Sequence, residues 1–156
     1  MRGTWMKHRL LNKYLILLDV GGLLYILLEL LWRGQSHWSM FVLGGVCFVA
    51  LGLINEVLSW NTPLWLQVFI GAAIITVLEF LTGCVVNLWL GWNVWDYSDV
   101  PGNLLGQVCF KYSLLWLPVS LAGAILDDWL RYRWFGEERP HYNLGFTSGS
   151  DWILKI

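Results

Sequence analysis

Two glutamates lie deep inside long apolar stretches of the chain, and they are the residues best placed to do chemistry. Glu29 and Glu79 are each surrounded by runs of Leu, Ile, Val and Phe. An ionisable side chain in hydrocarbon is costly, so such groups usually face a protein interior or a water-filled cavity and serve a function. A carboxylate there could bind a proton, a cation or a substrate amine. We therefore treat Glu29 and Glu79 as candidates for an ion-binding or substrate-binding site.

A polar segment between the third and fourth apolar stretches supplies further candidates. It mixes aromatic residues with groups that can donate or accept hydrogen bonds, namely Asp96, Tyr97, Asn103 and Gln107, and is followed by the cation Lys111. Lys111 could neutralise one of the two glutamates. Pro101 and Gly102 mark a turn. The segment could be a plain aromatic loop at the membrane surface or a lid over the carboxylates, and the sequence leaves both open.

A second set of polar residues falls near the opposite ends of the apolar stretches. The set comprises Asp19, Asn55, Glu56, Asp127, Asp128 and Arg131. Asp127 and Arg131 are four residues apart, which is a favourable spacing for an ion pair on a helix. The sequence favours an interfacial network that anchors helix ends over a second functional site.

Several chemistries are absent from the sequence. It contains no GxSxG, HExxH or GxGxxG pattern and no Walker motif, so the chain does not hydrolyse ATP by that route. The three histidines and three cysteines lack metal-ligand spacing, and we expect no metal and no cofactor. A net charge of −1 gives no indication of nucleic-acid binding.

The composition shows which elements must position these residues. Hydrophobic residues make up 57% of the 156 and charged residues only 13%, with 12 tryptophans, which is typical of a membrane protein. Four apolar runs at about 14–32, 40–58, 64–90 and 109–131 reach the length of about 20 residues that a membrane-spanning helix needs. We predict an all-α integral membrane four-helix bundle in one domain, 1–134, with a partly re-entrant or lid-like loop between the last two helices. Residues 135–156 are expected to form a cytoplasmic tail.

Charge asymmetry gives the orientation and an estimate of depth. Most Lys and Arg residues precede the first run or follow the fourth, which predicts a multi-pass protein of the plasma membrane with both termini in the cytoplasm and the lipid bilayer around it. Glu29 and Glu79 then each lie fifteen residues into an outward-running helix. At 1.5 Å per residue, both carboxylates would be about 22 Å from the cytoplasmic boundary and could meet at one level.

Three sequence elements together carry a resemblance to a known family. LEFLTG at 78–83, WDYSDVPGNLLGQVC at 95–109 and ELLWRG at 29–34 resemble the CmpB-like family of small bacterial membrane proteins, described as type IV ABC-transporter proteins or permeases. The resemblance covers roughly residues 25–132. It implies that Gly83, Trp95 and Gly106 belong to the family's structural motif, beside the polar candidates already named. The compact SHWSMF segment after Arg33-Gly34 departs from the longer Gly- and Pro-rich stretch of other members.

The residues and the resemblance together favour a permease-like membrane protein that moves or binds a small solute or ion. Four helices are few for a conduction path, so we expect a homo-oligomer or another membrane subunit, and a separate ATPase subunit if ATP drives transport. Two alternatives remain open. One is a structural or pore-forming assembly protein of the phage-holin type. The other is a metal-dependent membrane enzyme that acts on lipid head groups, although the sequence favours a protein that is not an enzyme.

Overall fold

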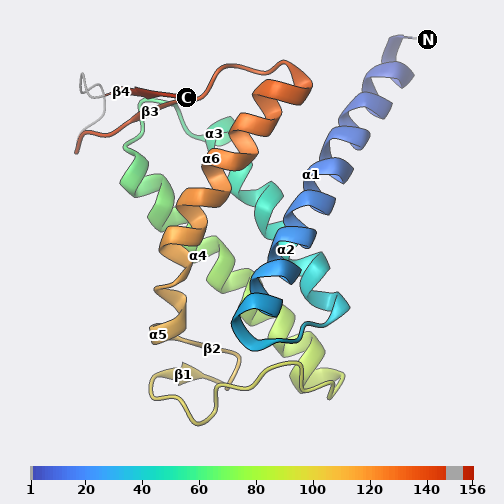
Figure 1. Ribbon diagram of the computed structural model, residues 1–156, viewed down its shortest axis with the longest axis vertical. Helices are drawn as coiled ribbons and strands as arrows, with labels where there is room; N and C mark the ends of the chain where they lie inside the picture. The colour runs from blue at the N-terminus through green and yellow to red at the C-terminus, as the bar shows by residue number, and fades with distance from the viewer. Residues whose placement is uncertain (1, 147–152) are drawn as a thin grey trace. The chain divides into compact units, whose positions relative to one another are not determined.

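The computed structural model describes residues 2–146 and 153–156, with side chains from Arg9 onward (Figure 1). Within that part of the chain, four helices are long and apolar enough to cross a membrane: Arg9–Arg33, Trp38–Val57, Leu64–Trp89 and Phe110–Phe135. Their bounds agree with the predicted runs to within a few residues, except that the first helix begins earlier and the last ends later. The predicted all-α class with four membrane-length helices is confirmed.

The chain divides into two compact units, and the first covers Met1–Val49. It contains helix α1 (Arg2–Arg33) and most of helix α2 (Trp38–Gly52). Glycines let these two backbones approach closely. A Cβ atom on Gly21 would lie 2.2 Å from Cβ of Phe48, and one on Gly44 would lie 2.2 Å from Cβ of Tyr25. Larger residues at either glycine would therefore separate the two helices.

The second unit, Ala50–Ile156, contains the remaining helices. These are α3 (Ile54–Val57), α4 (Leu64–Gly83), the π-helix η1 (Cys84–Trp89) that continues α4, α5 (Phe110–Ser113) and α6 (Trp116–Phe135). Helix α4 packs against α6. Pro63 immediately precedes α4, where its missing N–H costs no helical hydrogen bond, and Gly136 ends α6 in the left-handed conformation with φ +69°.

Two short antiparallel hairpins complete the second unit. In the loop after η1, β1 (Asn103–Leu104) pairs with β2 (Val108–Cys109), with Leu104 opposite Val108. Beyond α6, β3 (His141–Asn143) pairs with β4 (Ile153–Lys155), with Tyr142 opposite Leu154. The segment expected to be a polar tail thus includes packed structure.

Tyr142 shows how the tail is held. Its side chain is fully buried, and its hydroxyl donates a 2.7 Å hydrogen bond to Oδ2 of Asp128 in α6. Trp60 packs against the rings of both His141 and Tyr142. The side-chain amide of Asn143 donates to the backbone carbonyl of Asn61 at 2.9 Å. Contacts with the α3–α4 connection and with α6 therefore fix the β3 strand.

Candidate functional site

Glu79 is buried near the middle of the third membrane-length helix. Only 3% of the residue is exposed, and it lies on the same face of α4 as the buried residues Ala72, Ile75 and Gly83. The indole N–H of Trp116, at the start of α6, donates to its Oε2 at 2.9 Å. The hydroxyl of Tyr97, in the loop after η1, lies 3.5 Å from its Oε1. Residues from three separate segments thus meet at this carboxylate.

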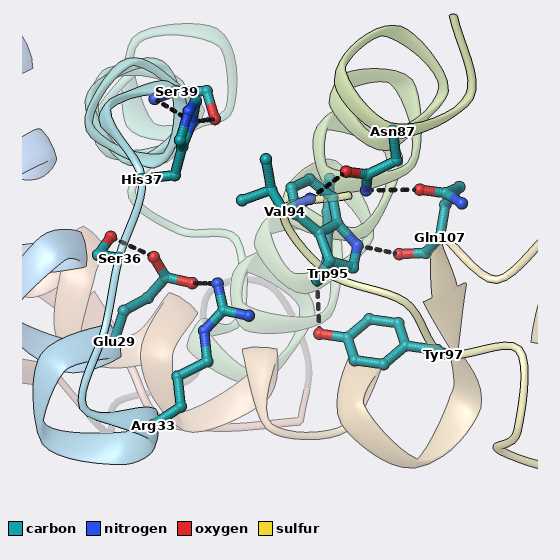
Figure 2. Close-up of polar contacts among 11 residues, drawn as sticks. Glu29, Arg33, Ser36, His37, Ser39, Asn87, Val94, Trp95, Tyr97 and Gln107 are labelled. Carbon is teal, nitrogen blue, oxygen red and sulfur yellow. Dashed lines mark hydrogen bonds and ion pairs between the residues drawn. The ribbon is translucent and has the colours of Figure 1, made fainter. Parts of the chain in front are cut away.

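The loop that brings Tyr97 to Glu79 is fastened to the end of the same helix (Figure 2). The buried side chain of Trp95 donates its indole N–H to the backbone carbonyl of Gln107 at 2.8 Å. Asn87 in η1 donates to the side-chain oxygen of Gln107 at 2.8 Å and accepts a 2.7 Å hydrogen bond from the backbone N–H of Val94. Asn87 therefore joins both ends of the loop to the π-helix.

Gly83 provides the space for this loop. A Cβ atom at Gly83 would lie 2.6 Å from Oε1 of Gln107 and 3.0 Å from the ring of Trp95. Gly83 is also four residues after Glu79, so it occupies the next turn on the same face. The loop can pack beside Glu79 because Gly83, on the adjacent turn of the same face, has no side chain.

The polar residues of the loop shape its turns. Asp96 Oδ1 accepts hydrogen bonds from the hydroxyl of Ser98 at 2.6 Å and from its backbone N–H at 2.8 Å. These two hydrogen bonds, the side-chain one first, lower the pKa of Asp96. Asn103 accepts from the backbone N–H of Gly106 and donates to two backbone carbonyls. Asp96 and Asn103 therefore hold the loop's conformation, with Asp96 exposed to solvent.

Gly106 and its neighbour form a tight turn. Leu105 and Gly106 both have positive φ, +52° and +69°, and the backbone N–H of Gln107 donates to the carbonyl of Leu104 at 3.0 Å. This is the geometry of a type I′ hairpin turn, in which glycine is favoured. The backbone N–H of Tyr97 donates to the carbonyl of Gly106 at 2.8 Å, so the turn also sets the position of Tyr97.

Lys111 lies beside the aromatic part of this site. Its ammonium group is 5.5 Å from the ring centroid of Tyr112, and the Tyr112 ring is 5.1 Å from that of Tyr97. Lys111 therefore lies next to Tyr112, and Tyr112 in turn packs against Tyr97. Neutralisation of a glutamate by Lys111 remains a prediction.

Glu29 lies in the first unit and has local partners (Figure 2). Arg33, one turn later on α1, donates to Oε1 at 2.5 Å, and the hydroxyl of Ser36 donates to Oε2. Both partners are within seven residues of Glu29. The proposed meeting of Glu29 with Glu79 stays a prediction.

The second polar set is assembled around two adjacent aspartates of α6. The fully buried Asp127 pairs with the guanidinium of Arg131, and Nη1 of Arg131 lies 3.6 Å from Oε1 of the half-exposed Glu56. A Cβ atom on Gly52 would lie within 3 Å of the Asp127 carboxylate, so this glycine gives the carboxylate its room. Asp19 is exposed on α1, in the other unit.

Asp128, which the sequence placed in this polar set, forms its other half together with Tyr142, which the sequence did not single out. Asp128 Oδ2 accepts hydrogen bonds from the side-chain amide of Asn55 at 2.6 Å and from the hydroxyl of Tyr142. Burial, followed by the nearby Asp128 carboxylate, raises the pKa of Tyr142, so this hydroxyl remains a donor. Nothing in the sequence of the polar tail distinguishes Tyr142.

Trp116 and Asn87 are also site residues that were not predicted as such. Both had a signal in the sequence. Asn87 continues the four-residue spacing of Glu79 and Gly83, and Trp116 lies inside an apolar run rather than at its boundary. Within the described residues, no three His, Cys, Asp or Glu side chains are grouped so that they could hold a metal ion.

One known family matches most of the chain. The profile of the family described as "Putative ABC-transporter type IV" matches residues 5–132. The match includes both glutamates, the loop, the first three membrane-length helices and the fourth as far as Tyr132. The chain belongs to that family, and it is a multi-pass membrane protein. No solved structure matches the chain.

Proposed function

We propose that the protein is a permease-like subunit of the plasma membrane in which Glu79 binds the transported or coupling cation, namely a proton, a metal cation or a substrate amine. The observation that carries this proposal is the burial of Glu79 in an apolar helix between two neutral donors. The indole and phenol groups stabilise a carboxylate without contributing a positive charge of their own. A carboxylate held in this way can exchange its proton or attract a cation.

The loop from Trp95 to Gln107 is, in this proposal, the cap over the outer entrance to Glu79. It is supported by the buried contacts of Trp95 and Gln107 with the end of α4 and with η1. Tyr97 is its functional contact because its hydroxyl lies 3.5 Å from the Glu79 carboxylate. The other polar residues, Asp96, Asn103 and Gly106, would position Tyr97.

The proposal includes partners and an orientation. Both termini would be cytoplasmic, and a second copy or another membrane subunit would complete the conduction path. If ATP drives transport, a separate ATPase subunit must dock on the cytoplasmic side. A tag at either terminus that external protease digests in intact cells would contradict the orientation.

The role of Glu79 is tested by replacing it with glutamine, which keeps the shape and removes the charge. Wild-type protein in lipid nanodiscs should unfold at a higher temperature when the ligand of Glu79 is supplied, that is, when the pH is lowered or when the sodium or potassium concentration is raised. Saturation at about 100 times Kd would stabilise the protein by roughly 2.7 kcal/mol. Glu79→Gln should lose that response and still fold.

The matched control is Glu138→Gln, which removes an exposed carboxylate outside the membrane-length helices. It should respond as the wild type does. An identical response in Glu79→Gln and the wild type would contradict the proposal. No response of the wild type to pH or to either cation would exclude the proton, sodium and potassium as the ligand of Glu79.

The predicted convergence of the two glutamates has its own test. Cysteines at positions 29 and 79, in a variant without Cys47, Cys84 and Cys109, should cross-link with a short bifunctional reagent in the membrane. Failure of that pair beside an efficient Tyr97→Cys and Glu79→Cys pair would remove Glu29 from the site and leave Glu79 in it.

A further inference from the structure

Two buried oxygen atoms between α4 and α6 are not used by the site described above. Ser120 is 0% exposed and Gln67 is 2% exposed. Within the part of the chain that the structure describes, Oγ of Ser120 and Oε1 of Gln67 have no hydrogen-bond partner. The amide nitrogen of Gln67 is satisfied, since it donates to the carbonyl of Thr62 at 3.0 Å. A buried polar atom without a partner is costly, and water is its usual partner.

The geometry places the two side chains in one neighbourhood. A Cβ atom on Gly71 would lie 2.0 Å from Oγ of Ser120, so the serine hydroxyl faces the backbone of α4 at Gly71. Gln67 is one turn before Gly71 on the same buried face of α4. Residues four apart on a helix are neighbours with about 5–6 Å between their Cβ atoms. The Gln67 amide extends from its Cβ toward the carbonyl of Thr62, just before the start of α4, so water is needed to connect it with the Ser120 hydroxyl.

This neighbourhood lies between the two polar clusters of α6. Trp116, which donates to Glu79, is one turn before Ser120, a rise of about 6 Å. Asp127 is seven residues after Ser120, a rise of about 10.5 Å, and its partner Arg131 reaches the half-exposed Glu56. Along these helices, Ser120 and Gln67 therefore lie between Glu79 and a carboxylate in contact with solvent, with a rise of about 12 Å on α4 from Gly71 to Glu79.

We propose that water held by Ser120 and Gln67 forms a proton route between Glu79 and the Asp127–Arg131–Glu56 cluster. The inference rests on the proposed function and names the proton as the cation that Glu79 exchanges. A proton leaves the Glu79 carboxyl group and binds to a water oxygen, and that water gives a different proton to the next acceptor. The Ser120 hydroxyl accepts one proton and donates its own. Asp127 accepts the proton from the last water and returns it to water beside the half-exposed Glu56, while the Arg131 guanidinium keeps its protons throughout. The net change is one proton delivered to solvent beside Glu56 and one carboxylate left at Glu79.

Proton flux into liposomes tests this route. Purified protein is reconstituted with a pH-sensitive dye inside, and a potassium gradient with valinomycin supplies the driving force. The wild type should acidify the lumen faster than protein-free vesicles. Ser120→Ala and Gln67→Leu should each lower the rate about tenfold, and Glu79→Gln should lower it at least as much.

Thr76→Val is the matched control, because the Thr76 hydroxyl is already satisfied by the carbonyl of Ala72 on its own helix. Its flux should equal that of the wild type. Wild-type flux in Ser120→Ala and Gln67→Leu, with loss in Glu79→Gln, would overturn the route and leave the role of Glu79 intact. Wild-type flux no faster than that of empty vesicles would also overturn the route, whereas the role of Glu79 is judged separately by its unfolding response.

A measurement on the unmodified protein guards against variants that fail to fold. Leu51 packs against both Gly71 and Gly123, so its side chain borders the proposed water. Although Leu51 is buried, hydroxyl radicals generated from internal water by a brief X-ray pulse should oxidise it at a rate well above that of Leu17, which is also buried. Equal, background-level oxidation of the two leucines would overturn the proposal.

Discussion

Glu29 and Glu79 look alike in the sequence, but their surroundings differ in kind. Glu29 is four residues from the end of α1, and its partners Arg33 and Ser36 come from the same stretch of chain. Glu79 is ten residues from the end of its membrane-length helix, and its donors Trp116 and Tyr97 are 37 and 18 residues away. The first carboxylate is paired locally with a cation, whereas the second depends on the tertiary fold.

This difference separates two ways of placing an acid in an apolar helix. A carboxylate one turn from a helix end can be balanced by an arginine at i+4, and such a pair needs no further structure. A carboxylate in mid-helix must be reached by donors from other segments, and its environment exists only when those segments are packed. Of the two donors to Glu79, Tyr97 belongs to the loop and Trp116 to the start of α6, so the environment of this carboxylate depends on both segments.

The largest effect in this comparison is expected from removing the donor to Glu79. Trp116→Phe keeps an aromatic ring and deletes the indole N–H, and hydrogen bonds to charged groups contribute roughly 1.5–3 kcal/mol. The free energy of unfolding in mild detergent should fall by about that amount. Trp129→Phe is the control, since Trp129 lies on the same helix and is partly exposed, and it should change stability by less than about 0.5 kcal/mol. Equal losses of unfolding free energy in the two variants would show that the hydrogen bond from the Trp116 indole to Glu79 does not stabilise the protein.

The sequence predicted the helices and missed most of the contacts that make the site. Hydrophobic length alone located the four helices, because a span must satisfy its own backbone and exclude charge over about 20 residues. Burial of Glu79 on the face that also carries Gly83 follows from the helical period. Nothing in that period gives the rotation of α6 that aims Trp116 at Glu79.

The loop and the tail show the same limit more strongly. The path of the segment from Trp95 to Gln107 depends on a missing side chain at Gly83 and on Asn87 in a π-helical turn. Tyr142 is buried by partners in α6 and in the connection before α4, both distant in the sequence. Contacts between segments distant in the sequence depend on how those segments pack, and local propensity carries little information about them.

A smaller effect is expected at the other carboxylate. Arg33→Gln removes the cation beside Glu29, and a pair of this kind near a surface contributes about 0.3–1 kcal/mol. Because part of the Arg33 side chain is exposed, added salt should weaken the contribution. A double-mutant cycle with Glu29→Gln measures the coupling in unfolding free energy at low and high salt. A coupling as large as the loss in Trp116→Phe would erase the distinction between the two acids.

The smallest effect is expected at Asp96, which shapes the loop beside Glu79 through its hydrogen bonds with Ser98. Hydrogen bonds from the side chain and backbone of Ser98 lower the pKa of Asp96 below its ordinary value of 3.8. An acid with a lowered pKa in the folded state stabilises that state above about pH 4, and the contribution is lost as pH falls through the folded pKa. In acid, the turn at Ser98 should therefore loosen and Tyr97 should move away from Glu79.

The measurement is an NMR titration of the Asp96 carboxyl group in the wild type and in Ser98→Ala. The pKa of Asp96 should rise toward its ordinary value in Ser98→Ala, because the hydrogen bond from the Ser98 hydroxyl is the larger cause of the lowered pKa. Asp96→Asn should abolish the acid-dependent change in the Tyr97 resonances, and a change that survives in this variant would assign it to another group.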